Sequence, residues 1–259
     1  MHRLLVPPAE LESDSPSLPK EAADHLRVLR PENGEEIELF DGRGRWRRFS
    51  ACVSGRTFSL VANAPVESAP RPPCSLTLFA CVTKGSRWDW TVAKATELGA
   101  TRIVPVVSAR TIVRIGTDER VAKRDRWMRV AEDAARQSDA KWLPEVCEPV
   151  GFTESLALVR ETVCFAGALT NPPPRPLLRV LLDGLKMQLP NCQTTKPHNS
   201  FSVFVGPEGD FTPEELSALL EIATPVSFGP TVLRAETAAI YGLSVLKAAL
   251  DAMHDVRAG

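Results

Sequence analysis

The sequence predicts a two-domain protein in which a small, mostly β domain precedes a larger α/β domain with a mainly parallel sheet. Three observations lead to this prediction. Before Pro65, strand-forming residues alternate with polar ones. The stretch "PVESAPRPPC", Pro65 to Cys74, has the composition of a stiff connector. After it, strand runs alternate with helix-like stretches, as in parallel sheets. We place the domains at residues 1–70 and 71–259.

The first domain is predicted from "EEIELFDGRGRWRRFSACVSGRTFSLVA", which alternates strand-formers with polar residues. Asp41-Gly42 and Ser54-Gly55 interrupt this run with dipeptides typical of tight hairpin turns. Short strands joined by hairpins favour a small sheet, and we expect it to be barrel-like.

The second domain is predicted from the alternation of two kinds of segment. The expected strands are "SLTLFACV", "RIVPVVS", "TVCFAGAL", "FSVFVG" and "PVSFG". The expected helices lie around Val92 to Leu98, Glu119 to Gln137, Thr212 to Ala223 and Ala235 to Leu250. The stretches "TNPPPRP" and "PNCQTTKPHNS" are polar and contain proline, so we expect surface loops there.

Composition and charge narrow the possible functions. The formal net charge of -1 gives no overall attraction to nucleic acid, so any RNA contact must come from local clusters of arginine. The 6 cysteines contain no CxxC pair and the 4 histidines do not cluster, which predicts no metal site and no disulfide framework. The N-terminus has no long apolar core and no later run reaches membrane-spanning length, so we expect a cytoplasmic protein without membrane segments.

The segment "FVGPEGDFTPEE", Phe204 to Glu215, carries the first candidate site. A buried strand ends at Gly206, and Thr212 with Glu215 forms the capping box of a new helix. Loops at the carboxyl ends of parallel strands are where α/β sheets bind ligands, and Gly206 and Gly209 allow close approach to the backbone. Because Glu208 and its acidic neighbours repel phosphate, we expect a neutral or cationic ligand. An ordinary strand-turn-helix is the alternative.

The segment "FGPTVLRAETAAIYGLSVLKAAL", Phe228 to Leu250, carries the second candidate site. Arg234 and Glu236 lie beside a glycine-bearing strand end. An arginine can hold an oxygen that acquires negative charge and a carboxylate can accept a proton, so the pair suits a step that removes a proton. A surface ion pair and a well-packed alanine-rich helix are the alternatives.

Four blocks occur in order and resemble the signatures of one family. They are "KGSRWDWTVAKATELGATRIVPVVSART", "AARQSDAKWLPEV", "VGPEGDFTPEE" and "VLRAETAAIYGLSVL". Together they are similar to the bacterial 16S ribosomal RNA uridine-N3 methyltransferases of the SPOUT superfamily. "HLRVLRPENGEEIELFDGRGR" resembles the PUA-like RNA-binding domain of the same family.

The resemblance implies a fold, a cofactor and an assembly. It implies a PUA-like β-barrel followed by an α/β domain with a C-terminal trefoil knot, S-adenosylmethionine bound within the knot, and a homodimer. It implies no metal. Carried over by position, the cofactor residues are Val205, Gly206, Pro207, Gly209, Phe228, Gly229, Leu233 and Thr237.

The reaction that the resemblance implies is methylation of N3 of a uridine in 16S ribosomal RNA. That nitrogen carries a proton at neutral pH, so we assign Arg234 to the developing charge on a uracil oxygen and Glu236 or Glu208 to the proton. The open alternatives are a related enzyme that methylates a ribose 2′-hydroxyl or another base, and a non-catalytic RNA-binding protein with the same fold.

RNA contacts are predicted from local positive charge. Arg43, Arg45 and Arg47 alternate along an expected strand and therefore share one face, although charges also protect edge strands from aggregation. The other predicted RNA contacts are His25, Arg27, Arg30, Lys84 and Arg110. Arg87 would extend the track on the second domain.

The chain departs from the family pattern at a few positions. Asp210 stands where the family loop has its second glycine, and Asp139 stands where "EQSGR" has glycine. Arg136, Ala140 and Thr231 are further departures, and Lys141 is a candidate to replace the missing arginine. These changes bear more on RNA contacts than on the cofactor.

Overall fold

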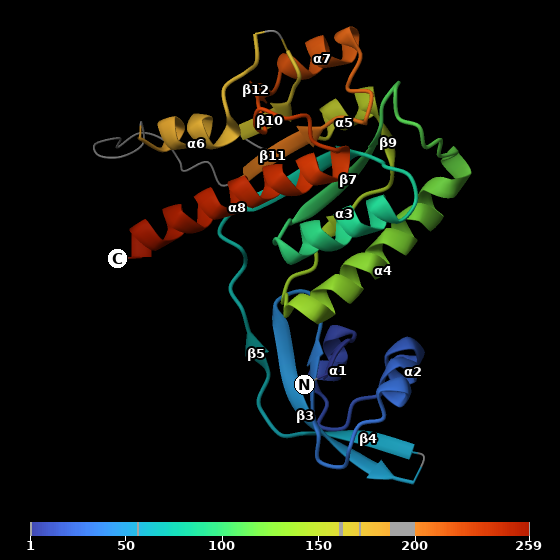
Figure 1. Cartoon of the computed structure of the whole chain (residues 1–259). Helices are drawn as coiled ribbons and strands as arrows, with labels where there is room; N and C mark the ends of the chain where they lie inside the picture. Colours follow the sequence, from blue (N-terminus) through green and yellow to red (C-terminus); the bar gives the residue numbers. More distant parts are fainter. Residues whose placement is uncertain (1, 56, 161–162, 171, 187–199, 259) are drawn as a thin grey trace. The chain divides into compact units, whose positions relative to one another are not determined.

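A computed structural model describes residues 2–55, 57–160, 163–170, 172–186 and 200–258 (Figure 1). The predicted polar loop at Pro190 to Ser200 lies outside the described residues except for Ser200, which begins a strand. The chain divides into two compact units, Met1–Pro72 with Glu132–Leu143, and Pro73–Ala131 with Pro144–Gly259. None of the described helices is long and apolar enough to cross a membrane.

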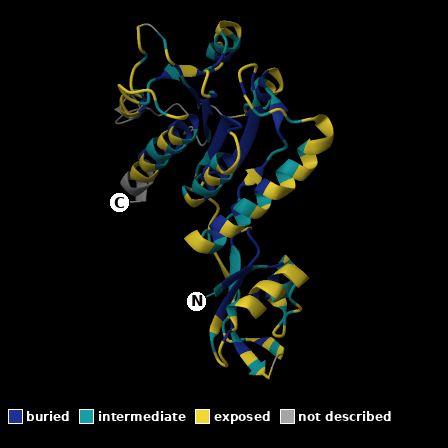
Figure 2. Cartoon of the chain, turned by 45° about the vertical axis from the view of Figure 1, so that its right-hand side comes forward, coloured by how far each residue is buried: buried dark blue, intermediate teal, exposed yellow. Residues whose placement is uncertain are grey.

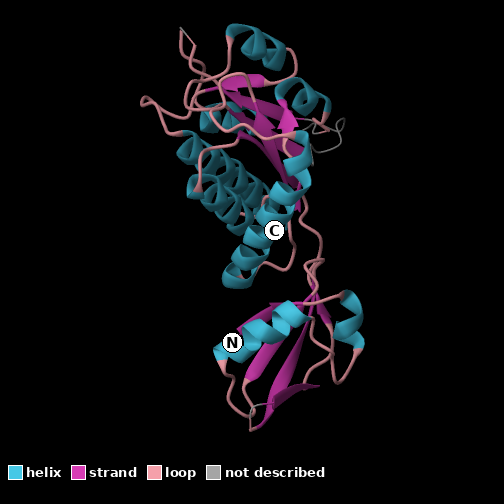
Figure 3. Ribbon diagram, turned by 90° about the vertical axis from the view of Figure 1, so that its right-hand side faces the viewer, coloured by secondary structure: helices cyan, strands magenta, loops and turns pink. Residues whose placement is uncertain are grey.

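The first unit is a small sheet with two helices (Figure 3). Its elements are β1 (His2–Leu5), α1 (Pro8–Glu12), α2 (Lys20–Leu29), β2 (Glu36–Phe40), β3 (Arg45–Ser54), β4 (Thr57–Ala62) and β5 (Glu67–Ser68). The strand order is β1-β2-β3-β4, with β5 pairing to β3. Because these pairings form an open path, closure into a barrel stays a prediction.

The two predicted hairpins are confirmed. β2 and β3 pair antiparallel across the turn that contains Asp41 and Gly42, and Gly42 adopts a positive φ of 67°. β3 and β4 also pair antiparallel, with Ser54 opposite Thr57. The mostly β prediction missed α1 and α2, although α2 buries Ala22 and Leu26 one turn apart. These two residues pack in the apolar core of the unit together with residues of the strands.

A buried ion-pair network holds the segment 132–143 within the first unit. The Glu38 carboxylate is 2% exposed, and its Oε1 accepts hydrogen bonds from Arg3 Nε and Lys141 Nζ, both at 2.7 Å. Arg3 also donates to the carbonyls of Ala135 and Ala140, at 2.7 and 3.3 Å. Lys141, a candidate RNA contact in the sequence, is therefore bound to a buried carboxylate.

The second unit is a parallel α/β sheet, as predicted. Its strands are β6 (Ser75–Cys81), β7 (Arg102–Val107), β8 (Glu145–Val146), β9 (Val150–Gly151), β10 (Val163–Gly167), β11 (Ser200–Val205) and β12 (Thr224–Val226). All described pairings are parallel, in the order β12-β10-β11-β6-β7-β8, with β9 pairing to β7.

Helices cover both faces of this sheet. They are α3 (Ser86–Glu97), α4 (Arg120–Ser138), α5 (Phe152–Ala157), α6 (Leu177–Lys186), α7 (Pro213–Leu220) and α8 (Ala235–Ala258), with a short 3-10 turn at Thr117–Glu119. Alternate residues of β6 point to opposite faces, so Leu78 packs with the core under α3, α6 and α8 while Phe79 packs with the core under α5 and α7. The central strands are therefore buried on both sides (Figure 2).

The strands β6, β7, β10, β11 and β12 lie where the sequence predicts them, and so do α4, α7 and α8. The helix expected around Val92 begins earlier, at Ser86, because Trp88 is the first buried residue on its apolar side. The helices α5 and α6 were not predicted.

Candidate functional site

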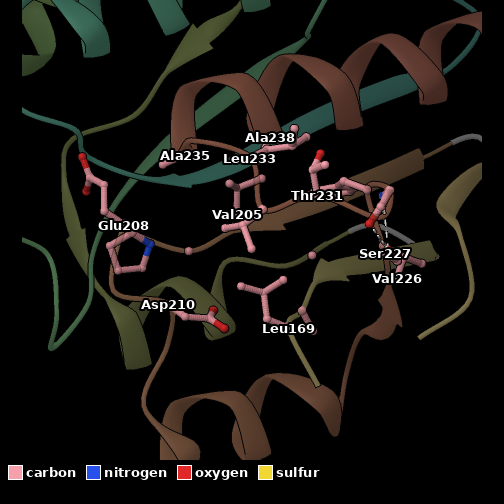
Figure 4. Close-up of a pocket in the computed structure, with 17 residues that line it drawn as sticks. Leu169, Val205, Glu208, Asp210, Val226, Ser227, Thr231, Leu233, Ala235 and Ala238 are labelled. Atoms are coloured by element: carbon pink, nitrogen blue, oxygen red, sulfur yellow. Dashed lines mark hydrogen bonds between the residues drawn. The ribbon is translucent and has the colours of Figure 1, made fainter. Parts of the chain in front are cut away.

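A pocket lies at the carboxyl ends of three neighbouring strands of the second unit (Figure 4). Its walls come from the segments that follow β10, β11 and β12 and from the first turn of α8. The lining residues are Gly167, Ala168, Leu169, Val205, Gly206, Pro207, Glu208, Asp210, Val226, Ser227, Phe228, Gly229, Thr231, Val232, Leu233, Ala235 and Ala238. This is the edge of a parallel sheet where ligands bind.

The loop between β11 and α7 forms as the sequence predicts. Thr212 caps α7: its side chain accepts a hydrogen bond from the N–H of Glu215, and the Glu215 carboxylate accepts one from the N–H of Thr212. Asp210 adopts a left-handed backbone with φ of 59°, and its Oδ1 accepts a hydrogen bond from the N–H of Phe211 at 2.8 Å. Aspartate tolerates this region better than most residues, which explains how it replaces glycine.

Side chains from other parts of the second unit hold this loop. Arg87 Nη1 lies 3.2 Å from Glu208 Oε1, and Arg110 Nη1 donates to the carbonyls of Gly209 and Phe211 at 2.9 and 3.3 Å. The N–H of Ala109 donates to the Glu215 carboxylate at 2.8 Å. Arg87 and Arg110, both predicted to contact RNA, therefore contact the loop in this structure.

Most of the predicted cofactor residues line the pocket. Val205, Gly206, Pro207, Phe228, Gly229 and Leu233 do so, whereas Gly209 and Thr237 do not. A Cβ atom added at Gly209 would lie 3.5 Å from the Arg110 side chain, so close approach of a ligand at that residue stays a prediction. Thr237 is exposed on α8.

The three predicted catalytic residues have different surroundings. Glu208 lines the pocket, whereas Arg234 and Glu236 lie beside lining residues without lining it. Arg234 is exposed; its carbonyl accepts a hydrogen bond from the N–H of Ala238 at 2.8 Å, but its guanidinium has no partner among the residues that the structure describes. The Oε2 atom of Glu236 is buried and also has no partner in the described part of the chain. An unpaired buried carboxylate oxygen is costly, which is typical of functional groups.

The sequence did not predict the contribution of Gly167, Ala168 and Leu169, which follow β10. Their position beside the other two loops depends on β10 lying between β11 and β12, an order that no residue pattern reveals. Thr231 and Val232 were also missed as lining residues, although both adjoin predicted ones.

Gly167 offers a test of the pocket shape. A Cβ atom at this position would lie 2.3 Å from Phe228 Cε2, so an alanine must displace the Phe228 ring, which itself lines the pocket. We expect Gly167→Ala to weaken ligand binding at least tenfold, about 1.4 kcal/mol. Gly151→Ala is the matched control, because its backbone is ordinary and nothing lies within 4 Å of the added atom. Equal affinity of the two variants for S-adenosylmethionine, measured by calorimetry, would contradict the expected result.

The charge of the pocket limits its ligand. Glu208 and Asp210 are acidic, and none of the described lining residues is lysine, arginine or histidine. Most of the others are apolar or glycine. The pocket therefore suits a partly apolar ligand that carries positive charge, and it disfavours phosphate.

Cys81 lies at the end of β6, the strand next to β11. Burial raises the pKa of its thiol to about 11. The thiol is therefore protonated near neutral pH and is a poor nucleophile. Among the described residues there is no group of three or more His, Cys, Asp and Glu side chains placed to hold a metal ion.

The three arginines of the predicted RNA face do not all lie on one strand, and their contact with RNA stays a prediction. Arg43 lies in the turn before β3, between Gly42 and Gly44, whose positive φ values interrupt the predicted strand. Arg45 forms an ion pair with Glu12. Arg47 has a side chain only 13% exposed, which donates to the carbonyls of Ala64, Leu11 and Ser13 and pairs with Asp14. Arg47 therefore joins chain segments in this structure.

The other predicted RNA residues are on the surface of their units. His25 and Arg27 lie on α2, and Arg30 ends that helix with a left-handed φ of 50°. Burial, followed by the charges of Arg136 and His2, lowers the pKa of His25, so this side chain is neutral at pH 7. Arg30 and Lys84 are exposed, and no described residue forms an ion pair with either.

Comparison with known proteins gives a consistent result. The family model of an RNA methyltransferase domain matches residues 70–247. A ribosomal RNA small subunit methyltransferase E from Synechocystis sp. is 30% identical over 253 residues, which cover 96% of this chain and 78% of that protein. The protein of the same name from Mycobacterium bovis is 32% identical over 225 residues, covering 85% of this chain and 80% of its own.

Solved structures resemble nearly the whole chain. A ribosomal RNA small subunit methyltransferase E from Neisseria gonorrhoeae, bound to S-adenosyl methionine, has a TM-score of 0.78 and 27% identity, covering 96% of this chain and 97% of that one. A methyltransferase from Legionella pneumophila, in complex with the cofactor SAM, has a TM-score of 0.79 and 27% identity, covering 95% and 97%. The α/β fold of the second unit is thus a methyltransferase fold.

Proposed function

This chain belongs to the RNA methyltransferase family, and from that premise we propose that it transfers the methyl group of S-adenosylmethionine to N3 of a uridine in 16S ribosomal RNA. The observation that carries the proposal is the acidic, largely apolar pocket at the ends of β10, β11 and β12. S-adenosylmethionine has a positive sulfonium and an adenine ring whose flat faces suit apolar side chains, which match this lining. The relatives and solved structures with the same name support the choice of reaction and substrate.

The residues around the pocket fit this cofactor. Gly206 lines the pocket at the end of β11 without a side chain, and an added Cβ atom there would lie only 3.2 Å from Asp210 Oδ1 and 3.3 Å from the Phe211 ring. Phe228, Leu233 and Val205 supply an apolar surface for adenine. The cofactor supplies an activated methyl group when bound, and the protein supplies position and proton transfer.

The protein must remove a proton because N3 of uracil is protonated at neutral pH. The N3–H bond breaks, the electron pair of N3 forms the new bond to the methyl carbon, and the carbon–sulfur bond breaks to leave a neutral thioether. Arg234, whose guanidinium is exposed, stabilises the negative charge that develops on a uracil oxygen. Glu236, with its unpaired buried oxygen, or Glu208, which lines the pocket, accepts the proton.

The resemblance also implies a trefoil knot, and the chain path of the second unit supports it. β12 lies beside β10 on the edge opposite to β11, so the chain crosses β10 on its way from β11 to β12. After β12, helix α8 packs on β11 and β6. The segment before α6 runs beside the end of β12: the N–H of Ser227 donates to Arg175 at 2.9 Å, and the N–H of Leu177 donates to Ser227 at 3.0 Å. The segment after β12 thus passes close to the loop that connects β10 and α6.

The proposal includes a homodimer that acts in the cytoplasm and a PUA-like first unit that binds RNA. Leu169 and Val232 support the dimer, because these apolar side chains are 63% and 77% exposed where they line the pocket. Arg30, Arg43 and Lys84 support RNA contact, because they are exposed and form no ion pair with any described residue.

Exposed cations make a specific prediction about RNA. Replacing Arg30 and Lys84 together with alanine should weaken RNA binding and reduce the slope of log affinity against log salt by about one unit for each phosphate that is no longer neutralised. Affinity for S-adenosylmethionine should stay unchanged, because neither residue lines the pocket. Filter binding of a ribosomal RNA fragment at several salt concentrations measures the slope, and a slope equal to wild type would make both residues ordinary surface charges.

The proposed function is tested by product analysis. Ribosomal RNA methylated by the purified protein and digested to nucleosides should contain N3-methyluridine, identified by mass spectrometry. A 2′-O-methylated nucleoside or another methylated base would show a different enzyme of the same superfamily. Absence of S-adenosylmethionine binding by the folded protein would favour a non-catalytic RNA-binding protein.

A further inference from the structure

Two carboxylates line the pocket, and their electrostatic surroundings differ. Glu208 is paired with Arg87 at 3.2 Å, and Figure 4 shows its carboxylate directed away from the other labelled lining residues. Asp210 forms no ion pair with any residue in the described part of the chain, and its side chain points toward Leu169 in the same view. The uncompensated negative charge of the lining is therefore that of Asp210.

Arg110 binds the same loop without forming an ion pair with Asp210. Arg110 donates its hydrogen bonds to the carbonyls of Gly209 and Phe211, on either side of Asp210 in the chain, and it does not line the pocket. Asp210 itself uses one oxygen to accept the hydrogen bond from the N–H of Phe211 at 2.8 Å. A carboxylate with one oxygen used in this way keeps acceptor capacity on the other.

We propose that Asp210 makes the pocket discriminate between the methyl donor and the demethylated product, a role that rests on the proposed function. S-adenosylmethionine carries a sulfonium, whereas S-adenosylhomocysteine has a neutral thioether in the same position and is otherwise identical in charge. An anion in the pocket attracts the first and has no such attraction for the second. The unpaired carboxylate therefore favours binding of substrate and release of product.

The decisive variant is Asp210→Asn. Asparagine tolerates a φ of 59° as aspartate does, and its side-chain oxygen can still accept the hydrogen bond from Phe211, so only the charge is removed. We expect the Kd of S-adenosylmethionine to rise about three- to tenfold, as for the loss of one attraction between charges near a protein surface. The Kd of S-adenosylhomocysteine should stay within about twofold of wild type. Asp210→Gly should also raise the ratio of the Kd of S-adenosylmethionine to the Kd of S-adenosylhomocysteine.

Glu214→Gln is the matched control. Glu214 is exposed at the start of α7, four residues from Asp210, and it does not line the pocket. A hydrogen bond from its own backbone lowers the pKa of Glu214, so this variant also removes one full negative charge at neutral pH. The ratio of the two Kd values should not change in this variant.

Calorimetry at low ionic strength with each ligand alone measures both constants without any turnover. If Asp210→Asn raises the two Kd values by the same factor, Asp210 is a structural residue of the loop and the proposal is overturned. Two Kd values equal to those of wild type would also overturn it. These outcomes differ from failure of the proposed function, in which wild-type protein binds neither ligand. A wild-type result of that kind would overturn both.

Discussion

Replacing Arg234 with alanine is expected to lower kcat by roughly a hundredfold or more and to leave KM close to its wild-type value. The guanidinium meets charge that appears only as N3 loses its proton, so its contribution is largest after the substrate is bound. The exposed guanidinium has no partner among the described residues, so in the free protein it is not committed to another structural contact. Arg234→Lys should recover only part of the loss, because lysine keeps the charge but lacks the planar fork.

Single-turnover rates on a saturating RNA fragment, measured across pH, decide between catalysis and binding. A higher pH should restore the alanine variant more than wild type, because hydroxide then helps to remove the proton. A variant with normal kcat and raised KM would make Arg234 an RNA clamp. The catalytic assignment would then pass to Glu208 and Glu236 alone.

Replacing Glu38 with alanine is expected to destabilise the first unit by about 3–5 kcal/mol. The change leaves the guanidinium of Arg3 and the ammonium of Lys141 without the carboxylate that both contact at 2.7 Å. Both cations keep a contact with the Asp139 carboxylate, at 3.2 Å from Arg3 Nε and 2.8 Å from Lys141 Nζ, but that carboxylate is 67% exposed. The side chain of Arg3 is only 6% exposed, so neither water nor an exposed carboxylate fully replaces the buried one. Removal of one member of a buried pair is costly for this reason, even where the intact pair adds little net stability.

Glu36→Ala is the control for Glu38, because the two residues are neighbours on the same side of β2. The Glu36 carboxylate is 46% exposed and lies 3.9 Å from Arg48, a surface pair that contributes about 0–1 kcal/mol. Urea denaturation followed by circular dichroism compares the two variants. Similar midpoints for both would show that the Glu38 network is solvated in solution and contributes as little as a surface pair.

The sequence predicted the second unit better than the first for a physical reason. Strands such as β6 and β11 are buried on both faces and read as continuous apolar runs, which are easy to recognise. In the first unit, α2 is a surface helix that buries only Ala22 and Leu26, a weak signal beside the clear hairpins. The carbonyl contacts of Arg47 could not be predicted, because a charged side chain that binds backbone carbonyls has the same sequence pattern as one that faces RNA.

The two aspartates that depart from the family pattern show what a sequence leaves out. Asp139 and Asp210 both replace glycine, and they adopt φ values of 58° and 59°. The sequence shows only that each position carries a charge. The structure shows that each position has a left-handed backbone, which aspartate tolerates better than most residues. Both acidic groups therefore stand where the backbone geometry restricts the choice of residue.

The order of strands in the sheet also affects how the protein forms during synthesis. β6 leaves the ribosome early, yet one of its edges pairs with β11, so that Ser75 meets Ser200. At a synthesis rate of about 5–20 residues per second, that edge waits roughly ten seconds for its neighbour. During this interval the growing chain presents unpaired backbone groups and the apolar face of β6 to other molecules. Protection of the nascent chain by a chaperone therefore matters most before residue 200 has emerged.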